Sequence, residues 1–429
     1  MKYRITTFCL VILMVFSLAT INYDDVYAAA KKPKSSKTKV TKGKSASKYK
    51  TTSKSRRSSR WSIRQASVRS RNVAYRRSIT RVSSVNNMLL STAKTFIGQD
   101  DLRGEDLELR RAALSAIGDH PATVVIMDPN NGKVYTMVNQ SWAIGKPFKP
   151  CSTIKLITSI AALNEGVADA DYPATIGGLG SINMINALAY SNNQYFQSLG
   201  YQLGFDQVIN YARQWGLGAK TGVNIDGESP GFLPEYKSPQ ALPRMCSHGD
   251  DIGVTALQLA VLTSAIANGG KIYQPQVLRT ETDKQTFQPK LIRNVTLTED
   301  VREKLIEGMV GAVTYGTARR SGAAPLNVAG KTGSCNGEES KLGLFASFSS
   351  PNKPNLVVVV VSTGSNERGS VSAGIAGEIY NNIAHRLGIE RNNSIDSLDS
   401  KPHRPRRVTT NDNNQLEFDG EEEDEEDEE

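Results

Sequence analysis

The sequence predicts a single α/β domain of the α+β type, with a charged segment at each end of the chain. Apolar runs interrupted by turn residues predict strands near 122–139, 328–349 and 356–363. Between the first of these and the other two, apolar residues at helical spacing predict a helical block over 152–268. About 300 residues lie between the charged segments, which is enough to bury a substantial core.

Residues 1–30 have the layout of an export signal. Two basic residues, Lys2 and Arg4, precede an apolar stretch from Phe8 to Ile21, and small residues over 28–30 offer a cleavage site. The apolar stretch is short for a complete membrane span. A cleaved signal peptide and an inner-membrane anchor therefore both remain open, and either one predicts an exported, periplasmic or otherwise extracytoplasmic protein.

Residues 31–87 are expected to form a disordered basic arm. From Lys31 to Arg81 there are nineteen Lys or Arg residues and no Asp or Glu. This charge favours anionic membrane lipids or anionic wall polymers as partners. Nucleic acid would match the charge equally well, but an exported protein is not expected to meet it. Residues 61–82 are either a solvated linker or an amphipathic helix at a membrane surface.

The opposite end of the chain, residues 391–429, is expected to be a disordered tail. Its last stretch, Glu417 to Glu429, contains eleven acidic residues. The formal net charge of +9 thus conceals two oppositely charged tails around a nearly balanced domain. Neither tail carries residues that predict chemistry of its own.

Within the domain, each element has a local signal. A helix is expected over 101–117, packed on the sheet, and the strands near 122–139 should turn at 129–132. A buried helix should begin near Ser152, directly after Pro150. Residues 191–193 should cap a further helix over 194–203, and a last helix is expected over 373–387.

Three short segments carry the residues of a nucleophilic site. They are Ser152-Thr153-Ile154-Lys155 (SxxK), Ser191-Asn192-Asn193 (SxN) and Lys331-Thr332-Gly333 (KTG). Any one of them alone is weak evidence, because an SxxK arises by chance in a lysine-rich chain. All three in this order, each in a fitting local context, are specific.

The chemistry explains the residue types. A serine hydroxyl needs a neighbouring base, and Lys155 lies one helical turn after Ser152 on the same face. Burial near other cations would lower the pKa of Lys155 and leave an amine able to accept the serine proton. Ser191 and Asn193 suit proton relay and substrate positioning.

The KTG segment predicts a strand that lines the cleft. Gly333 would let an extended peptide approach the strand closely. The Lys331 ammonium, with the hydroxyls of Thr332 and Ser334, suits a terminal carboxylate of the substrate.

From about Asp119 to Leu387 the chain resembles the transpeptidase domain of penicillin-binding proteins. Beyond the three motifs, the resemblance covers the framing segments 122–135, 216–231, 254–270 and 316–330. It implies a catalytic domain over 88–390, with an antiparallel sheet flanked by helices, a helical lobe, and a cleft between the lobe and the sheet.

The resemblance also implies roles for individual residues. Ser152 would be the acylated nucleophile and Lys155 its base, and the backbone amides of Ser152 and Ser334 would form the oxyanion hole. The implied reaction is that of a serine-type D,D-transpeptidase on the D-Ala-D-Ala end of peptidoglycan stem peptides, or of a D,D-carboxypeptidase if water accepts the acyl group. Penicillins and other β-lactams would acylate the same serine. Partner proteins in cell-wall synthesis are not predicted.

Two other functions remain as alternatives. A β-lactamase would share the nucleophile, but no ExxLN-like segment offers a base to activate water. A penicillin or wall-peptide sensor would keep the fold without turnover; the charged tails favour it, whereas the intact motif residues do not.

Cysteine is the main departure from the family pattern. Cys151 precedes the nucleophile where the family usually has glycine, Cys335 follows the third motif, and Cys246 lies further upstream of that motif. A Cys151–Cys335 disulfide, a Cys246–Cys335 disulfide and small buried thiols remain open. His248, Asp250 and Asp251 either line the cleft or lie in a solvated loop. No histidine or cysteine shows metal-ligand spacing, so no metal or other cofactor is expected.

Overall fold

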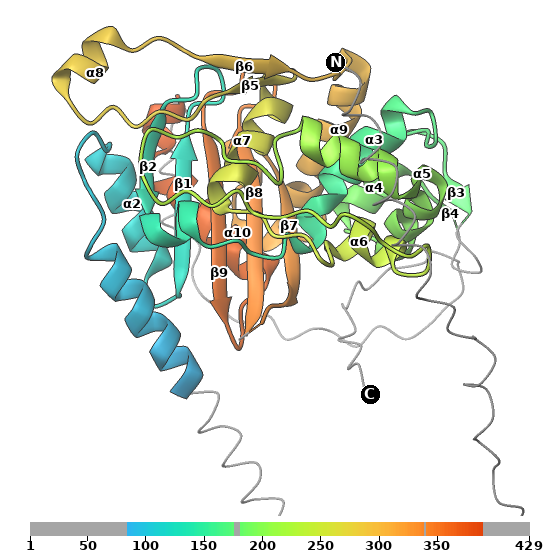
Figure 1. Cartoon of the computed structure of the whole chain (residues 1–429), viewed down its shortest axis with the longest axis horizontal. Coiled ribbons are helices and arrows are strands. Elements are labelled where there is room, and N and C mark those ends of the chain that lie inside the picture. The colour runs from blue at the N-terminus through green and yellow to red at the C-terminus, as the bar shows by residue number, and fades with distance from the viewer. Residues whose placement is uncertain (1–83, 176–180, 339, 389–429) are drawn as a thin grey trace, which may run out of the picture. The chain divides into compact units, whose positions relative to one another are not determined.

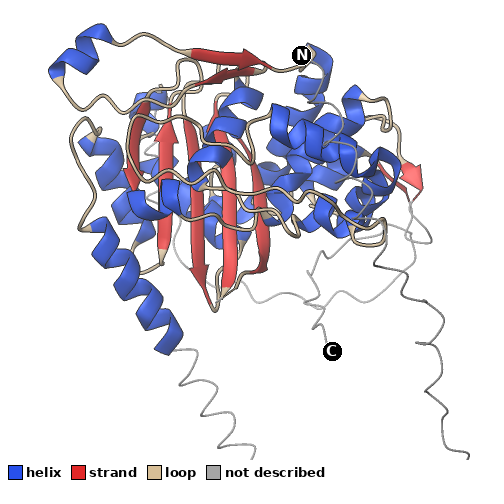
Figure 2. Cartoon of the chain, viewed as in Figure 1, coloured by secondary structure: helices blue, strands red, loops and turns tan. Residues whose placement is uncertain are grey.

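The computed structural model describes residues 84–175, 181–338 and 340–388. The predicted export signal, the predicted basic arm up to residue 83 and the predicted acidic tail lie outside the described residues. No helix in these described ranges combines the length and the apolar character needed to cross a membrane. Figure 2 shows a central sheet with helices on both of its faces and a cluster of helices beside it.

The main sheet of the described residues has five antiparallel strands in the order β2-β1-β9-β8-β7. Their bounds are β1 Ala122–Met127, β2 Val134–Val138, β7 Val328–Asn336, β8 Lys341–Ser349 and β9 Val357–Gly364. The predicted antiparallel sheet is confirmed. Strand β7, which carries the KTG segment, lies at the edge of this sheet.

Strand β9 shows why both faces of the sheet are covered. Its first five residues are all valine and are buried. Val357, Val359 and Val361 belong to one core cluster, whereas Val358 and Val360 belong to the other. Because successive side chains of a strand point to opposite faces, an uninterrupted valine run predicts helices on both sides.

One face is covered by α2 (Leu107–Ile117) and α10 (Gly369–Asn382). The helix expected over 101–117 begins six residues later, because Asp106 is its N-cap and Gly104 has a left-handed φ of 79°. The helix expected over 373–387 begins earlier, and its last residues form the separate short turn η5 (Ala384–Leu387).

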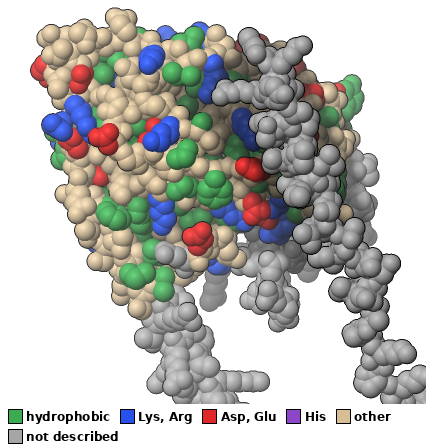
Figure 3. Space-filling view, viewed as in Figure 1, with side chains coloured by type: hydrophobic (Ala, Val, Ile, Leu, Met, Phe, Trp, Pro, Cys, Tyr) green, Lys and Arg blue, Asp and Glu red, His purple; other side chains and the backbone are tan. Residues whose placement is uncertain are grey.

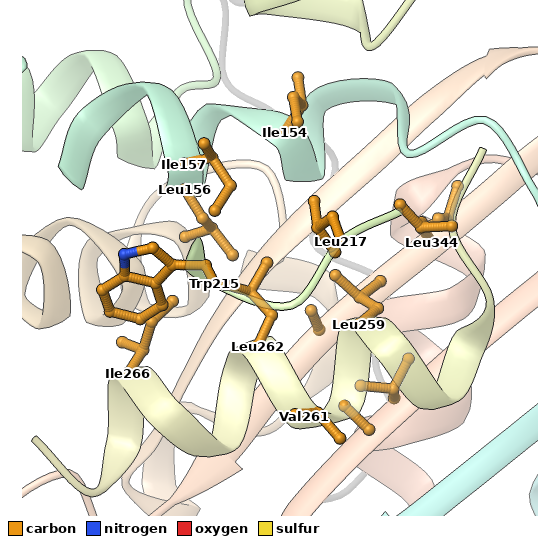
Figure 4. Close-up of a cluster of buried hydrophobic side chains, with 14 of the residues drawn as sticks. Ile154, Leu156, Ile157, Trp215, Leu217, Leu259, Val261, Leu262, Ile266 and Leu344 are labelled. Carbon is orange, nitrogen blue, oxygen red and sulfur yellow. The ribbon is translucent and has the colours of Figure 1, made fainter. Parts of the chain in front are cut away.

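The opposite face carries the helical lobe. Its helices are α3 (Lys155–Asn164), α4 (Met184–Ala189), α5 (Asn193–Gln214), α6 (Leu242–His248), α7 (Ala256–Ala267) and α9 (Glu299–Thr314). Helix α7 is buried along its whole length and connects the lobe to the sheet. In Figure 4, Leu259 and Leu262 of α7 lie in the same buried cluster as Ile157 of α3 and Leu344 of β8. The start of α3 therefore rests on the main core.

The remaining elements are short or peripheral. They are the hairpin β3 (Ala174–Thr175) and β4 (Ser181–Ile182), the pair β5 (Lys271–Tyr273) and β6 (Leu291–Asn294), α8 (Glu281–Thr286), η1 (Ser141–Gly145), η2 (Cys151–Ile154), η3 (Arg319–Ser321) and η4 (Ala324–Leu326). The sequence did not predict the β5–α8–β6 segment, which projects beyond the sheet in Figure 1. Gln276 ties this segment to the β1–β2 turn through backbone hydrogen bonds with Gly132 and Val134.

Residues 84–97 are helical in the structure. This helix overlaps the last four residues assigned from the sequence to the basic arm. The side chain of Asn86 donates to Ser365 Oγ at 2.6 Å and accepts from the Ser365 backbone N–H at 2.9 Å. The start of the described chain is thus attached to the loop that joins β9 to α10.

Candidate active site

The first predicted segment lies where η2 passes into α3. Thr153 Oγ1 donates to the Pro150 carbonyl at 2.6 Å, and Cys151 turns the chain with a left-handed φ of 49°. Lys155 is the first residue of α3, and its Nζ lies 3.1 Å from Ser152 Oγ. Ser152 is half-buried whereas Lys155 is fully buried, so the lysine has little access to water.

Lys155 also joins the second predicted segment to the first. Its Nζ donates to the Ser191 carbonyl at 2.6 Å, to Ser191 Oγ at 3.0 Å and to Asn193 Oδ1 at 2.6 Å. Ser191 adopts a left-handed φ of 59°, which is uncommon for a residue other than glycine. The capping expectation is confirmed at Asn192, whose Oδ1 accepts from the Tyr195 N–H at 2.8 Å at the start of α5.

The third segment reaches the same hydroxyl from the sheet. Lys331 is fully buried, and its Nζ donates to Ser191 Oγ at 2.8 Å and to the Thr332 carbonyl at 3.0 Å. Ser191 Oγ therefore lies within hydrogen-bonding distance of two lysine nitrogens. The structure thus brings the three segments together around the Ser191 hydroxyl.

Strand β7 presents its motif residues on alternate faces. Lys331, Gly333 and Cys335 face η2 and the helical lobe, whereas Thr332 and Ser334 face the start of α10. A Cβ atom on Gly333 would lie 3.0 Å from the Pro150 carbonyl oxygen. The strand and the nucleophile segment are therefore packed as closely as glycine allows.

A disulfide joins Cys151 to Cys335, with the two Cα atoms 5.6 Å apart. Of the three possibilities left open by the sequence, this is the one found. The Cys246–Cys335 alternative is wrong, because Cys246 is a free buried thiol that lies against Gly200. Burial raises the pKa of Cys246 to about 12, so it packs as a small apolar residue. The bridge connects the residue before Ser152 to the residue after Ser334.

Sequence reasoning missed two residues that touch the motif. Thr317 Oγ1 lies 2.6 Å from Thr332 Oγ1, and the Gly369 N–H donates to Ser334 Oγ at 2.8 Å. Thr317 had been noted only as part of a framing segment, and nothing near Gly369 resembles a motif. Only the fold brings these residues to β7.

The sequence left open whether His248, Asp250 and Asp251 line the cleft or lie in a solvated loop. In the structure the first two are half-buried and the third is exposed. Asp250 is half-buried and forms ion pairs with Lys149 at 2.6 Å and Arg244 at 2.9 Å, whereas Asp251 is exposed and contacts Lys237. His248 is half-buried, and its Nδ1 lies 2.6 Å from Ser247 Oγ. Burial, and then the charge of Lys155, lowers the pKa of His248 to about 4.

This lowered pKa predicts a pH-dependent stability. His248 stays neutral in the folded protein down to about pH 4, whereas in the unfolded chain it takes up a proton near its ordinary value of 6.5. The stabilisation is therefore complete above pH 6.5 and is lost as the pH falls toward 4. We expect His248→Gln to flatten the loss of unfolding free energy in this window. The difference between the two proteins in the slope of unfolding free energy against pH is at most about 1.4 kcal/mol per pH unit, and partial exposure of His248 reduces it. Urea unfolding at several pH values measures it, and equal slopes would contradict it.

On the face shown in Figure 3, acidic and basic side chains are intermixed rather than gathered by sign. In the described ranges, no group of three or more His, Cys, Asp or Glu residues is arranged to hold a metal ion.

Known proteins resemble this chain in sequence and in fold. The model of the penicillin binding protein transpeptidase domain matches residues 122–384. Stage V sporulation protein D of Bacillus subtilis is 26% identical over 325 residues, which cover 63% of this chain and 50% of that protein. Peptidoglycan D,D-transpeptidase MrdA of Acinetobacter baumannii is 26% identical over 360 residues, covering 64% of this chain and 53% of that protein. The chain thus spans about half the length of these relatives.

A solved structure shows the same fold. The crystal structure of Pseudomonas aeruginosa PBP2 in complex with WCK 5153 matches with a TM-score of 0.59 and 21% identity. The match covers 68% of this chain and 79% of that one. It confirms the predicted arrangement of an antiparallel sheet, flanking helices and a helical lobe.

Proposed function

This chain belongs to the penicillin-binding protein transpeptidase family, and on that premise we propose that it is a peptidoglycan D,D-transpeptidase with Ser152 as its nucleophile. The observation that carries the proposal is the continuous set of hydrogen bonds from Ser152 through Lys155 and Ser191 to Lys331. These residues come from three distant segments, and together they provide a hydroxyl, a buried amine and a path for a proton.

In the proposed first step, the Lys155 amine takes the proton of Ser152 while Oγ attacks the carbonyl carbon of the penultimate D-Ala. The backbone amides of Ser152 and Ser334 stabilise the oxyanion. As the peptide bond breaks, Ser191 passes a proton to the leaving D-Ala, and an ester to Ser152 remains. An amine from a second stem peptide then attacks the ester, releases the cross-linked product and returns the proton. Water in place of that amine would give D,D-carboxypeptidase activity.

Donor binding is assigned to β7 and its surroundings. An extended stem peptide would pair with the free edge of this strand. Lys331, Thr332 and Ser334 would bind the terminal carboxylate, and Asn193 would hold the peptide backbone. A β-lactam carries the same carboxylate and a reactive amide, so it would acylate Ser152 by the same route. We further propose that catalysis takes place outside the cytoplasm, with the basic arm bound to anionic lipids or wall polymers.

Ser152→Ala tests the nucleophile directly. We expect intact-mass spectrometry of the full chain mixed with penicillin to show one persistent adduct, which is absent in the variant. Turnover of a stem-peptide substrate should fall by roughly a millionfold, as for other serine nucleophiles.

The control is Ser198→Ala, whose hydroxyl donates to the Tyr195 carbonyl within α5 at 2.7 Å. An adduct that disappears within seconds while drug is consumed would indicate a β-lactamase instead. A stable adduct without any turnover of stem peptides would indicate a sensor. An adduct that persists in Ser152→Ala would refute the assignment of the nucleophile.

A further inference from the structure

The loop between β9 and α10, residues 364–369, touches the donor-binding strand from the side opposite the nucleophile. The Gly369 N–H donates to Ser334 Oγ at 2.8 Å. A Cβ atom on Gly369 would lie only 2.7 Å from the Cβ of Thr332, so the loop backbone rests directly on the motif. A Cβ atom on Gly343 of β8 would lie even closer to the Arg368 carbonyl oxygen. A shift of this loop would therefore move the amide that donates to Ser334 Oγ.

This contact determines which way the Ser334 hydroxyl can act. Its oxygen accepts a hydrogen bond from the Gly369 amide, so the hydroxyl hydrogen is left to donate. A hydroxyl that donates suits a carboxylate, which only accepts. Without the Gly369 contact, Ser334 could rotate and lose this preference. The loop thus prepares Ser334 for an anionic acyl donor.

An ion pair between Glu367 and His120 attaches the loop to the segment before β1. Glu367 Oε1 lies 2.7 Å from His120 Nδ1, and the Glu367 side chain is only 7% exposed. The other carboxylate oxygen is buried and has no hydrogen-bond partner among the described residues. His120 is 44% exposed and can exchange protons with solvent. A second attachment comes from Asn86, which makes two hydrogen bonds to Ser365.

We propose that Glu367 and His120 are positioning residues for acyl-donor binding, which act on Ser334 through the Gly364–Gly369 loop. The proposal rests on the proposed function. Neither residue belongs to a motif, and neither touches the nucleophile. While the pair is charged, it holds Gly369 against Ser334. When His120 loses its proton, a buried carboxylate is left without a cation, the loop relaxes and Ser334 is less well oriented.

The charges around His120 determine the direction of this effect. The hydrogen bond to Glu367 raises the pKa of His120 above its ordinary value of 6.5, and Asp119 adds to the rise. Lys94 of the helix 84–97 forms an ion pair with Asp119. Because the folded pKa is the higher one, the stabilising effect of the pair is complete below pH 6.5. It is lost as the pH rises through the raised pKa.

The test compares Glu367→Gln and His120→Asn with the unmodified full chain. The second-order rate constant for acylation of Ser152 by penicillin is measured between about pH 6 and about pH 9. We expect the ratio of wild type to Glu367→Gln to be roughly tenfold at the acidic end, as for a lost charge-assisted hydrogen bond. The ratio should fall toward one at the alkaline end. When the effect of Glu367→Gln is measured in a His120→Asn background, the corresponding ratio of rate constants should not change with pH.

The chain provides a matched control. His385 Nε2 contacts Glu108 Oε1 at 2.9 Å, and both side chains of this pair are exposed. Glu108→Gln and His385→Asn should both acylate like wild type at every pH. A ratio for Glu367→Gln that is constant across the pH range would mean a merely structural role and would overturn the proposal. A ratio of one throughout would overturn it as well.

A second readout does not depend on catalysis. Amide hydrogen exchange of the peptide that contains Gly369 should be slower in wild type than in Glu367→Gln near pH 6, and equal in the two near pH 9. If the two proteins show this exchange pattern but wild type is not acylated, the proposed function fails and the positioning role of Glu367 stands. If wild type is acylated normally and its exchange equals that of Glu367→Gln at both pH values, only the positioning role of Glu367 fails.

Discussion

Replacing Lys155 by methionine is expected to slow acylation of Ser152 by penicillin by roughly a thousandfold or more, as for removal of a general base. Lys155 Nζ lies 3.1 Å from Ser152 Oγ, and it also contacts Ser191 and Asn193. Methionine has a similar length but cannot accept the serine proton. Stopped-flow or quenched-flow mass spectrometry of the adduct measures the rate.

The charge and the base function of Lys155 can be separated. Lys155→Arg keeps a cation but cannot act as a base, so we expect it to be as slow as Lys155→Met. Lys149→Met is the matched control, because Lys149 is partly exposed and forms an ion pair with Asp250 near the cleft. It should acylate nearly as fast as wild type. Normal acylation of folded Lys155→Met would show that another group is the base.

Removing the disulfide in a Cys151→Ala, Cys335→Ala double variant is expected to give the largest loss of stability. The bridge closes a loop between residues that are 184 apart in sequence. By the chain-entropy relation, such a loop stabilises the folded state by about 5 kcal/mol, since it restricts the unfolded chain. Thermal or urea unfolding of the variant, compared with the oxidised wild type, measures the difference.

The same bridge should also affect acylation, because Cys151 is adjacent to Ser152 and has a left-handed φ of 49°. Without the covalent bond, alanine at position 151 would disfavour this conformation by about 1 kcal/mol or more, whereas glycine tolerates it. We therefore expect Cys151→Gly, Cys335→Ala to acylate faster than the double alanine variant. Cys246→Ala controls for the loss of a buried thiol. Equal stability of the double variant and wild type would refute the role of the bridge.

The sequence predicted the parts of the site that are encoded locally. Ser152 and Lys155 lie one helical turn apart, and the Asn192 cap needs only its own helix. The KTG segment was expected in a strand because an apolar run follows it, and it lies in β7 while that run lies in β8. For such features, short-range spacing and the apolar pattern contain most of the information.

The rest depends on contacts between residues that are distant in sequence. Thr317 and Gly369 reach β7 because α9 and α10 pack on the sheet. No local sequence pattern predicts that packing. The pairing of Cys151 with Cys335 needed the third dimension, since three cysteines allowed more than one outcome. Asn86 had been assigned to the basic arm because the composition changes gradually there, whereas its hydrogen bonds to Ser365 belong to the domain.

The edge position of β7 has a consequence for how the protein tolerates a crowded environment. An unpaired strand edge attracts any extended chain and is a common starting point for aggregation. Here the strand is enclosed on one face by η2, which approaches Gly333, and on the other by Gly369. The first six residues of the strand, Val328–Gly333, are also buried. Most of this edge is therefore shielded from the strands of neighbouring folded proteins, which lowers the tendency of the protein to aggregate through it.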